Sequence, residues 1–135
     1  MTQLVSESRI FGTLPQGNIL EISFRGTHEC SHGGEMNRYI REKLEEHAPA
    51  AIAFNLLDYQ YVWGNDVGVL FWASIVHRNP KEIRPVCILA TDTTYTSLHN
   101  LCKDSKLIDV FKIEFASTEE LALERLRERL GNRSV

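Results

Sequence analysis

One stretch, Ala51 to Arg78, constrains the fold more than any other, because in it two apolar runs flank a short polar loop. The first run, Ile52 to Leu57, has the length of a buried strand, and the second, Val67 to Val76, is long enough for a helix. We therefore predict a strand, a tight loop over Asp58 to Asn65, and a helix that opens at residues 64–66. In open α/β sheets, ligands bind beyond the carboxyl ends of the strands, and binding residues concentrate in loops on a rigid scaffold. The loop after this strand is therefore the first candidate for a functional site.

Length and composition indicate one globular domain over residues 1–135. The chain has 135 residues, of which 43% are hydrophobic and 24% charged, an ordinary balance for a single core. The formal net charge of -3 offers no basic field to nucleic acid or to an anionic membrane, so we expect neither as a partner. No apolar run approaches the roughly 20 residues that span a bilayer.

The cysteines and the first residues favour a cytoplasmic protein. Cys30, Cys87 and Cys102 are an odd number of cysteines at unrelated spacings, which argues against a disulfide framework and for a reducing compartment. Met1 to Ser8 is polar and has no basic segment ahead of an apolar run, so we expect no signal peptide.

The residues before the central stretch predict a hairpin. Arg9 to Leu14 is a short apolar segment, and Pro15 to Asn18 has the composition of a turn. The next segment alternates apolar and polar residues, namely Leu20, Ile22 and Phe24 with Glu21, Ser23 and Arg25. Such alternation is typical of a strand with one buried face and one face in water. Gly26 is predicted to close the hairpin.

A helix precedes the central strand, and another strand and helix follow it. Met36, Tyr39, Ile40 and Leu44 recur at helical spacing, and Pro49 should end this amphipathic helix. The apolar segment Pro85 to Ala90 predicts a strand. Thr91 to Thr93 offers capping residues for a helix that carries Tyr95, Leu98, Leu101 and Cys102.

The C-terminal part predicts a short strand around Val110 to Ile113 and a last helix. Ser117 and Glu120 have the spacing of a capping box, and Gly131 is the predicted C-cap. After the hairpin, strands and helices alternate, which indicates a mixed sheet with crossover helices. The predicted fold class is α/β, a small mixed β-sheet of four or five strands with helices mainly on one face.

The central helix is apolar on two sides. One side holds Val67, Leu70 and Phe71, and the other, here named the outer stripe, holds Val69, Trp72, Ala73 and Val76. One side can face the sheet, and the other needs cover, because a helix that is apolar all round is a buried helix. Flanking helices, a protein partner or a second copy in a homodimer would each provide that cover.

The loop before this helix has residues suited to binding. Trp63 is either an exposed anchor of the kind enriched at interfaces or a ring folded onto the core. Asn65 and Asp66 stand at the helix start, where an amide or carboxylate satisfies free backbone N–H groups and meets the positive end of the helix dipole. That structural role alone accounts for both residues.

No set of residues predicts catalysis, a metal or a cofactor. His28, Cys30 and His32 are possible zinc ligands, but they lack a fourth ligand and a usual spacing, and glycines follow as in a loop. His77 and His99 have no evident nucleophile with an orienting carboxylate, and no Gly-rich phosphate loop is present.

Three segments carry a resemblance to a known family. Val86 to Ala90 resembles the fourth strand of the STAS domain, the anti-sigma-factor-antagonist fold. Leu107 to Phe111 resembles the Gly-Leu-Asp-x-x-Phe-like turn of that family, and Ser117 to Ala122 is similar to its terminal Ser-x-Glu-Glu-Ala helix start. The specific likeness covers Asn55 to Leu130, and the N-terminal half matches in pattern only. The chain thus resembles a single STAS-like domain.

The family's signalling motif, Asp-Ser-Ser/Thr-Gly-Leu, has a first serine that a partner anti-sigma kinase phosphorylates. Aligned through Gly68 to Leu70, this chain has Trp63 to Val67 at the motif, with Gly64 at the serine position. A second register places Asn65 to Val69 there, with Asp66 on the serine, and the helical pattern favours the first register. Neither register has a hydroxyl at that position, so the resemblance implies a domain that is not switched at the usual serine.

The leading functional hypothesis is a non-enzymatic protein-protein interaction module of the STAS type in bacterial signalling and transcription regulation. The implied partner is an anti-sigma kinase-like protein or another STAS protein, with a homodimer as a further option. The predicted partner-binding residues are Asp58, Trp63, Gly64, Asn65, Asp66, Val69, Trp72 and Val76. An alternative is a small-molecule or lipid-binding STAS-like domain with an apolar pocket under Trp63 and Trp72. A third is an enzyme that uses Asp58, Asp66 or His77.

Overall fold

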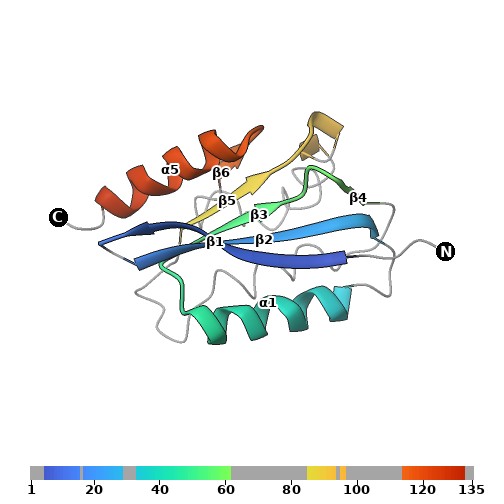
Figure 1. Cartoon of the computed structure of the whole chain (residues 1–135). Helices are drawn as coiled ribbons and strands as arrows, with labels where there is room; N and C mark the ends of the chain where they lie inside the picture. The colour runs from blue at the N-terminus through green and yellow to red at the C-terminus, as the bar shows by residue number, and fades with distance from the viewer. Residues whose placement is uncertain are drawn as a thin grey trace, which may run out of the picture.

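The computed structural model describes residues 5–15, 17–28, 33–61, 85–93, 95–96 and 114–132. Within them the chain forms a mixed sheet with α1 on one face and α5 on the other (Figure 1). The elements are β1 (Val5–Leu14), β2 (Gly17–His28), α1 (Gly33–His47), β3 (Ala51–Asn55), β4 (Tyr59–Tyr61), β5 (Val86–Leu89), β6 (Glu114–Ala116) and α5 (Glu119–Asn132). The predicted α/β class with a small mixed sheet is confirmed, although the two described helices lie one on each face and not mainly on one face as predicted. The predicted helix over residues 67–76 lies outside the described residues, and so do Leu98, Leu101 and Cys102 of the helix predicted to carry Tyr95.

The described strands lie in the order β1-β2-β3-β5-β6, with β4 paired to the end of β2 off this path. β1 and β2 are antiparallel, with Arg9 opposite Glu21, so the predicted hairpin is confirmed. β2, β3, β5 and β6 run parallel to one another, which is why their carboxyl ends share one edge of the sheet. Gly26 does not close the hairpin as predicted, because β2 continues through it to pair with β4.

The turn of the hairpin depends on a glycine. Gly17 has φ +137°, and a Cβ atom there would stand 2.9 Å from the Cβ of Ala50. The close approach ties the turn to the start of β3, where the amide of Ala50 donates to the carbonyl of Asn18 over 2.8 Å. Only glycine combines this backbone conformation with this approach.

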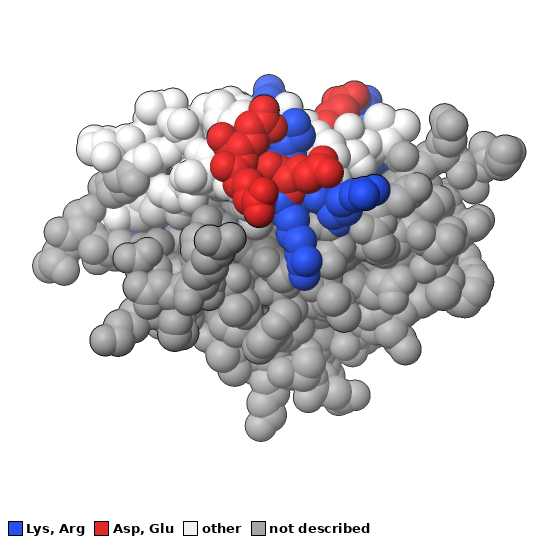
Figure 2. All heavy atoms as spheres, turned by 90° about the horizontal axis from the view of Figure 1, so that it is seen from below, with Lys and Arg blue, Asp and Glu red and all other residues white. Residues whose placement is uncertain are grey.

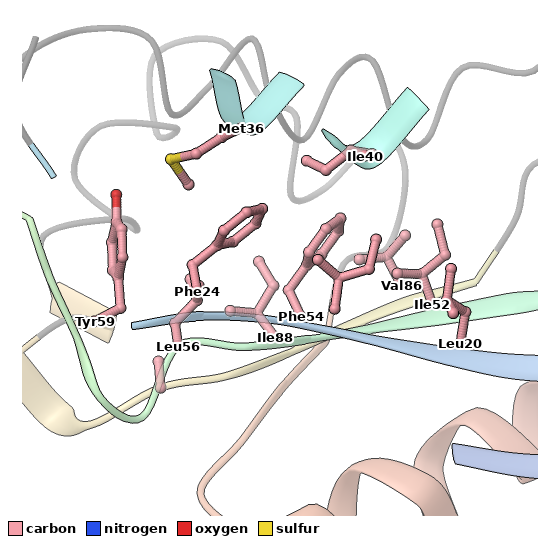
Figure 3. Packing of buried hydrophobic residues seen from close by; sticks show 12 residues of the cluster. Leu20, Phe24, Met36, Ile40, Ile52, Phe54, Leu56, Tyr59, Val86 and Ile88 are labelled. Atoms are coloured by element: carbon pink, nitrogen blue, oxygen red, sulfur yellow. The ribbon is translucent and has the colours of Figure 1, made fainter. Parts of the chain in front are cut away.

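The core between the sheet and α1 contains every second residue of the central strands. Phe24 and Phe54 point from β2 and β3 toward Met36 and Ile40 of α1 (Figure 3). Other buried members include Leu20, Ile22, Ile52, Leu56, Val86 and Ile88. In register, Phe54 pairs with Ile22 on one side and Ile88 on the other. Ile52, Phe54 and Leu56 are buried, so the buried strand predicted from the apolar run at Ile52 is confirmed.

The opposite face of the sheet packs on α5 through smaller residues. Its buried members are Ile19, Ala51, Ala53, Cys87, Leu89, Ala116, Ala122, Leu126 and Leu130. The alanines on both the sheet and the helix let the two backbones approach closely. Leu126 and Leu130 of α5 are buried, and Leu123 is partly buried beside them.

The ends of the two helices differ in part from the prediction. α1 stops at His47, and Ala48 adopts φ 42° before Pro49, as a helix that ends ahead of proline does. In α5 the capping side chain is that of Thr118, whose Oγ1 accepts a hydrogen bond from the amide of Leu121 at 3.2 Å. The cap predicted at Ser117 is therefore wrong by one residue.

Two further boundaries were displaced. Gly131 lies inside α5, which continues to Asn132, so the predicted glycine C-cap is wrong. The last strand is Glu114–Ala116, later than predicted, and residues 110–113 lie outside the described part. A helix begins within the segment Thr91 to Thr93, as predicted, and the amide of Tyr95 donates to the carbonyl of Thr91 over 2.8 Å.

Candidate functional site

Asp58 lies at the edge where the parallel strands end. β3 ends at Asn55, whose Oδ1 accepts a hydrogen bond from the amide of Leu57 at 3.1 Å. The carbonyl of Asp58 then accepts one from the amide of Gly26 at 3.1 Å. These bonds hold the start of the loop against β2, while the Asp58 side chain stays exposed. Asp58 lies in a turn after the central strand, as predicted, but the loop predicted over Asp58 to Asn65 is wrong in part, because Tyr59–Tyr61 form β4 and pair with β2.

The other predicted partner-binding residues lie outside the described part of the chain: Trp63, Gly64, Asn65, Asp66, Val69, Trp72 and Val76. His77 lies outside it too. Their assignment to the contact surface stays a prediction.

A polar hollow of about 400 Å³ lies beside Asp58, where the first turn of α5 meets the sheet. α5 packs over the part of the sheet that includes Ala51, Ala53 and Cys87, and the hollow occupies the same face nearer the carboxyl ends of the strands. Its lining residues come from β1, β2, β3 with the loop after it, and α5: Glu7, Ser8, Arg9, Glu21, Ser23, Arg25, Asn55, Asp58 and Glu119.

Arg9 is the centre of a charge network in this hollow. Its Nε donates to Oε1 of Glu21 at 2.7 Å, and its Nη2 lies 3.0 Å from Oε2 of Glu119. Nδ2 of Asn55 donates to the other oxygen of Glu119 at 3.2 Å. Arg25 pairs separately with Glu7 across the hairpin. The hydrogen bond and charge of Glu21 raise the pKa of Arg9, so the guanidinium stays charged at every ordinary pH.

Glu21 is the unusual residue of the hollow. It is only 3% exposed, although the carboxylate is charged in water. Within the described residues its second oxygen, Oε2, has no hydrogen-bond partner. Burial raises the pKa of Glu21, the bond from Arg9 opposes this, and the nearby charge of Glu119 adds to the rise. Leaving a buried acceptor without a hydrogen bond costs free energy, so a donor from outside the protein that reaches this oxygen would be stabilised by it.

The sequence pattern alone did not identify these residues. Alternation assigned Glu21 to the face in water, which is wrong, because Arg9 and the start of α5 cover it. Arg9, Asn55 and Glu119 were not singled out, since their separations of 12 and 64 residues from their partners follow no local period. The one available signal was an acidic residue in a strand with apolar neighbours on both sides.

Among the described residues, none form a group of three or more His, Cys, Asp or Glu that would hold a metal ion. Cys30 and His32 of the candidate metal loop lie outside that part. Cys87 is fully buried in β5, and burial raises the pKa of its thiol to about 12. A thiol of that pKa is a poor nucleophile at neutral pH.

The side of the molecule on which α1 lies carries charges of both signs. Figure 2 shows acidic and basic side chains next to one another there. Lys43 pairs with Glu46 at 2.9 Å, and Arg38 lies 3.9 Å from Glu42. This mixture forms no basic field of the kind that attracts nucleic acid. Within the part of the chain described, no helix is long and apolar enough to cross a membrane.

No protein-family model matches the chain, and no curated protein sequence does. A solved structure is nevertheless similar over most of its length: the crystal structure of an anti-sigma factor antagonist from Mycobacterium paratuberculosis. The superposition has a TM-score of 0.67 at 14% sequence identity and covers 93% of this chain and 95% of the other. At this identity the likeness establishes the fold. The chain therefore has the fold of an anti-sigma factor antagonist, the STAS fold that the sequence resemblance implied.

Proposed function

We propose that this protein is a non-enzymatic protein-protein interaction module of the STAS type in a bacterial regulatory pathway. The observation that carries the proposal is the likeness to an anti-sigma factor antagonist over 93% of the chain. An antagonist works by binding another protein, so the fold supports a protein partner, either an anti-sigma kinase-like protein or another STAS protein. The cytoplasm is the proposed location.

The proposed contact surface is the segment from Asp58 to Asp66 together with the outer stripe of the predicted central helix. Asp58 supports this choice, because it is exposed at the carboxyl edge of the sheet, where loops bind partners. Hydrogen bonds through Asn55 and Gly26 hold the start of the loop in one position. A preorganised loop loses less conformational entropy on binding than a free one does.

Affinity purification with mass spectrometry tests the function. The tagged chain should enrich a STAS protein or a kinase of the anti-sigma type from an extract of its own host. Trp72→Glu should abolish that enrichment, whereas Arg38→Ala, at a side chain 84% exposed on α1, should leave it intact. A partner retained equally by both variants would exclude the proposed surface, and a chain that enriches no regulatory protein would exclude the function.

We propose further that the partner is bound constitutively. In the favoured register Gly64 takes the usual serine position and accepts no phosphate, and Asp66 adds one fixed negative charge at the predicted helix start, where the helix dipole favours anions. Incubation with cell extract and ATP should therefore add no phosphate to residues 58–70. Asp66→Asn should change partner affinity modestly and less at high salt, since an exposed charge is screened over about 8 Å at physiological ionic strength.

The same experiment has a contrary outcome. Phosphate on a hydroxyl elsewhere in the neighbouring loop and helices would mean that the switch has moved within the fold. The hydroxyl residues to inspect are Ser74, Thr93, Thr94 and Ser97.

A further inference from the structure

The polar hollow contains a buried acceptor that the described protein atoms leave unsatisfied. Glu21 is more than nine-tenths buried, and its side chain lines the hollow. Oε1 receives the 2.7 Å bond from Arg9, whereas Oε2 receives none within the described residues. Buried polar atoms in folded proteins nearly always have a partner, so an unpaired carboxylate oxygen that faces a hollow indicates a missing donor.

The charges around the hollow favour a cation as that donor. Four carboxylates line it, and two guanidinium groups accompany them: Glu7, Glu21, Asp58 and Glu119 against Arg9 and Arg25. Arg25 is already paired with Glu7, and Arg9 is shared between Glu21 and Glu119. No cation in the described part of the chain pairs with Asp58. The hollow thus has an excess of negative charge, and two of its acidic groups have acceptor capacity to spare.

The size of the hollow suits a small molecule. About 400 Å³ lies within the range of roughly 300–1,000 Å³ that small-ligand sites occupy. The polar lining does not suit a lipid chain. Asn55 adds an amide to the wall, and its contacts with Glu119 and the Leu57 amide fix that side chain in place.

We propose that this hollow binds a small organic cation that carries an ammonium or guanidinium group, held by Oε2 of Glu21 and by the carboxylate of Asp58. An N–H donor on a cation makes a charge-assisted bond to each carboxylate, and such bonds are among the strongest in proteins. The site lies on the α5 face of the sheet. It does not depend on the proposed protein partner, although Asp58 borders both surfaces.

A second way to satisfy Glu21 exists inside the protein. Glu119 lies close enough for its charge and hydrogen bonding to raise the pKa of Glu21, so a proton held between the two carboxyl groups would also occupy Oε2. That arrangement needs no ligand and predicts no response to added amine. The two explanations are therefore separable by titration.

Titration of the ¹⁵N-labelled full chain with agmatine, followed by amide chemical shifts at pH 7, tests the site. Agmatine has a guanidinium at one end and an ammonium at the other. Saturable shifts are expected at Gly26, Asn55 and neighbouring amides. Glutarate, a dianion of similar length, is expected to bind at least tenfold more weakly because the hollow is acidic.

Two variants and one control complete the test. Glu21→Gln keeps an oxygen acceptor for Arg9 but removes the negative charge. The affinity for agmatine should fall about tenfold. Asp58→Asn, at an exposed side chain, should weaken agmatine binding by roughly threefold. Glu46→Gln, on the outer face of α1, should have no effect. Shifts that stay linear in agmatine, equal binding of glutarate, or wild-type affinity in both hollow variants would each overturn the proposal.

Discussion

Phe54 is the single side chain whose loss should damage the core most clearly. It is fully buried on β3 between Ile22 and Ile88 and points toward α1 (Figure 3). Phe54→Ala should lower the free energy of unfolding by about 3–5 kcal/mol, because it removes buried apolar surface and leaves a cavity. Urea denaturation measures this. Ile10→Ala, at a side chain 41% exposed, is the matched control and should change stability by no more than about 0.5 kcal/mol. An unchanged midpoint for Phe54→Ala would show that the core assignment is wrong.

Cys87 should be chemically silent in the folded protein. Burial raises the pKa of its thiol to about 12, so the reactive thiolate is scarce at pH 8 and solvent does not reach it. In a Cys30→Ser, Cys102→Ser background, iodoacetamide should label Cys87 only after denaturant is added, as mass spectrometry would detect. Rapid labelling of the native protein would mean that β5 opens readily, contrary to its central position.

At the scale of elements, only one of two neighbouring hydroxyl residues, Ser117 and Thr118, caps the start of α5. Thr118 supplies the hydroxyl that accepts the Leu121 amide, whereas the capping-box pattern predicted Ser117 for this role. Thr118→Ala should therefore cost about 1 kcal/mol of stability, the usual value of an N-cap. Ser117→Ala should cost much less under the same thermal or urea measurement. The reverse order would restore the capping box and move the helix start by one residue.

The end of α1 contains an alanine in a conformation better suited to glycine. Ala48 has φ 42° and an exposed side chain. A left-handed backbone conformation costs an alanine about 1–2 kcal/mol, which glycine would avoid. Glycine also gives the unfolded chain more conformational entropy, and this offsets part of the stabilisation. Ala48→Gly should thus raise stability by about 0.5–1 kcal/mol, and Ala48→Val should lower it. The midpoint temperatures of thermal unfolding of the two variants should shift in opposite directions from that of the wild type. A shift in the same direction would argue against a left-handed conformation at Ala48.

At the scale of the whole molecule, the outer stripe predicts self-association if no other partner covers it. Symmetric dimers are the commonest closed oligomers, and Val69, Trp72 and Val76 would meet across the two-fold axis. Sedimentation should then show a dimer that Trp72→Glu converts to a monomer. Ile10→Glu, on edge strand β1, should leave the dimer intact. A wild-type monomer at high micromolar concentration would exclude the homodimer and leave a different partner or cover from within the chain.

The amino-acid sequence by itself predicted the strands β1, β2, β3 and β5 and the side of β2 that packs on α1, but it did not predict β4. The alternation of Leu20, Ile22 and Phe24, and the apolar run at Ile52, reflect the need to bury one face, and this need acts locally. The order of strands and helices, together with the likeness of residues 86–90, 107–111 and 117–122, indicated the STAS fold. Boundaries were less well predicted, because Ser117 and Thr118 both cap helices, and only the approach of α5 to the sheet selects one.

The tertiary structure alone decided the polar hollow. Glu21 and Ser23 are equivalent in the sequence pattern, yet Glu21 is 3% exposed and Ser23 is partly open. The difference arises because antiparallel pairing places Arg9 opposite Glu21 and packing brings Glu119 over both. Burial of a charge depends on partners that are distant along the chain, and local periodicity contains no information about them. A hydrophobic pattern therefore predicts the core, whereas a site made of charges becomes visible only when the chain has folded.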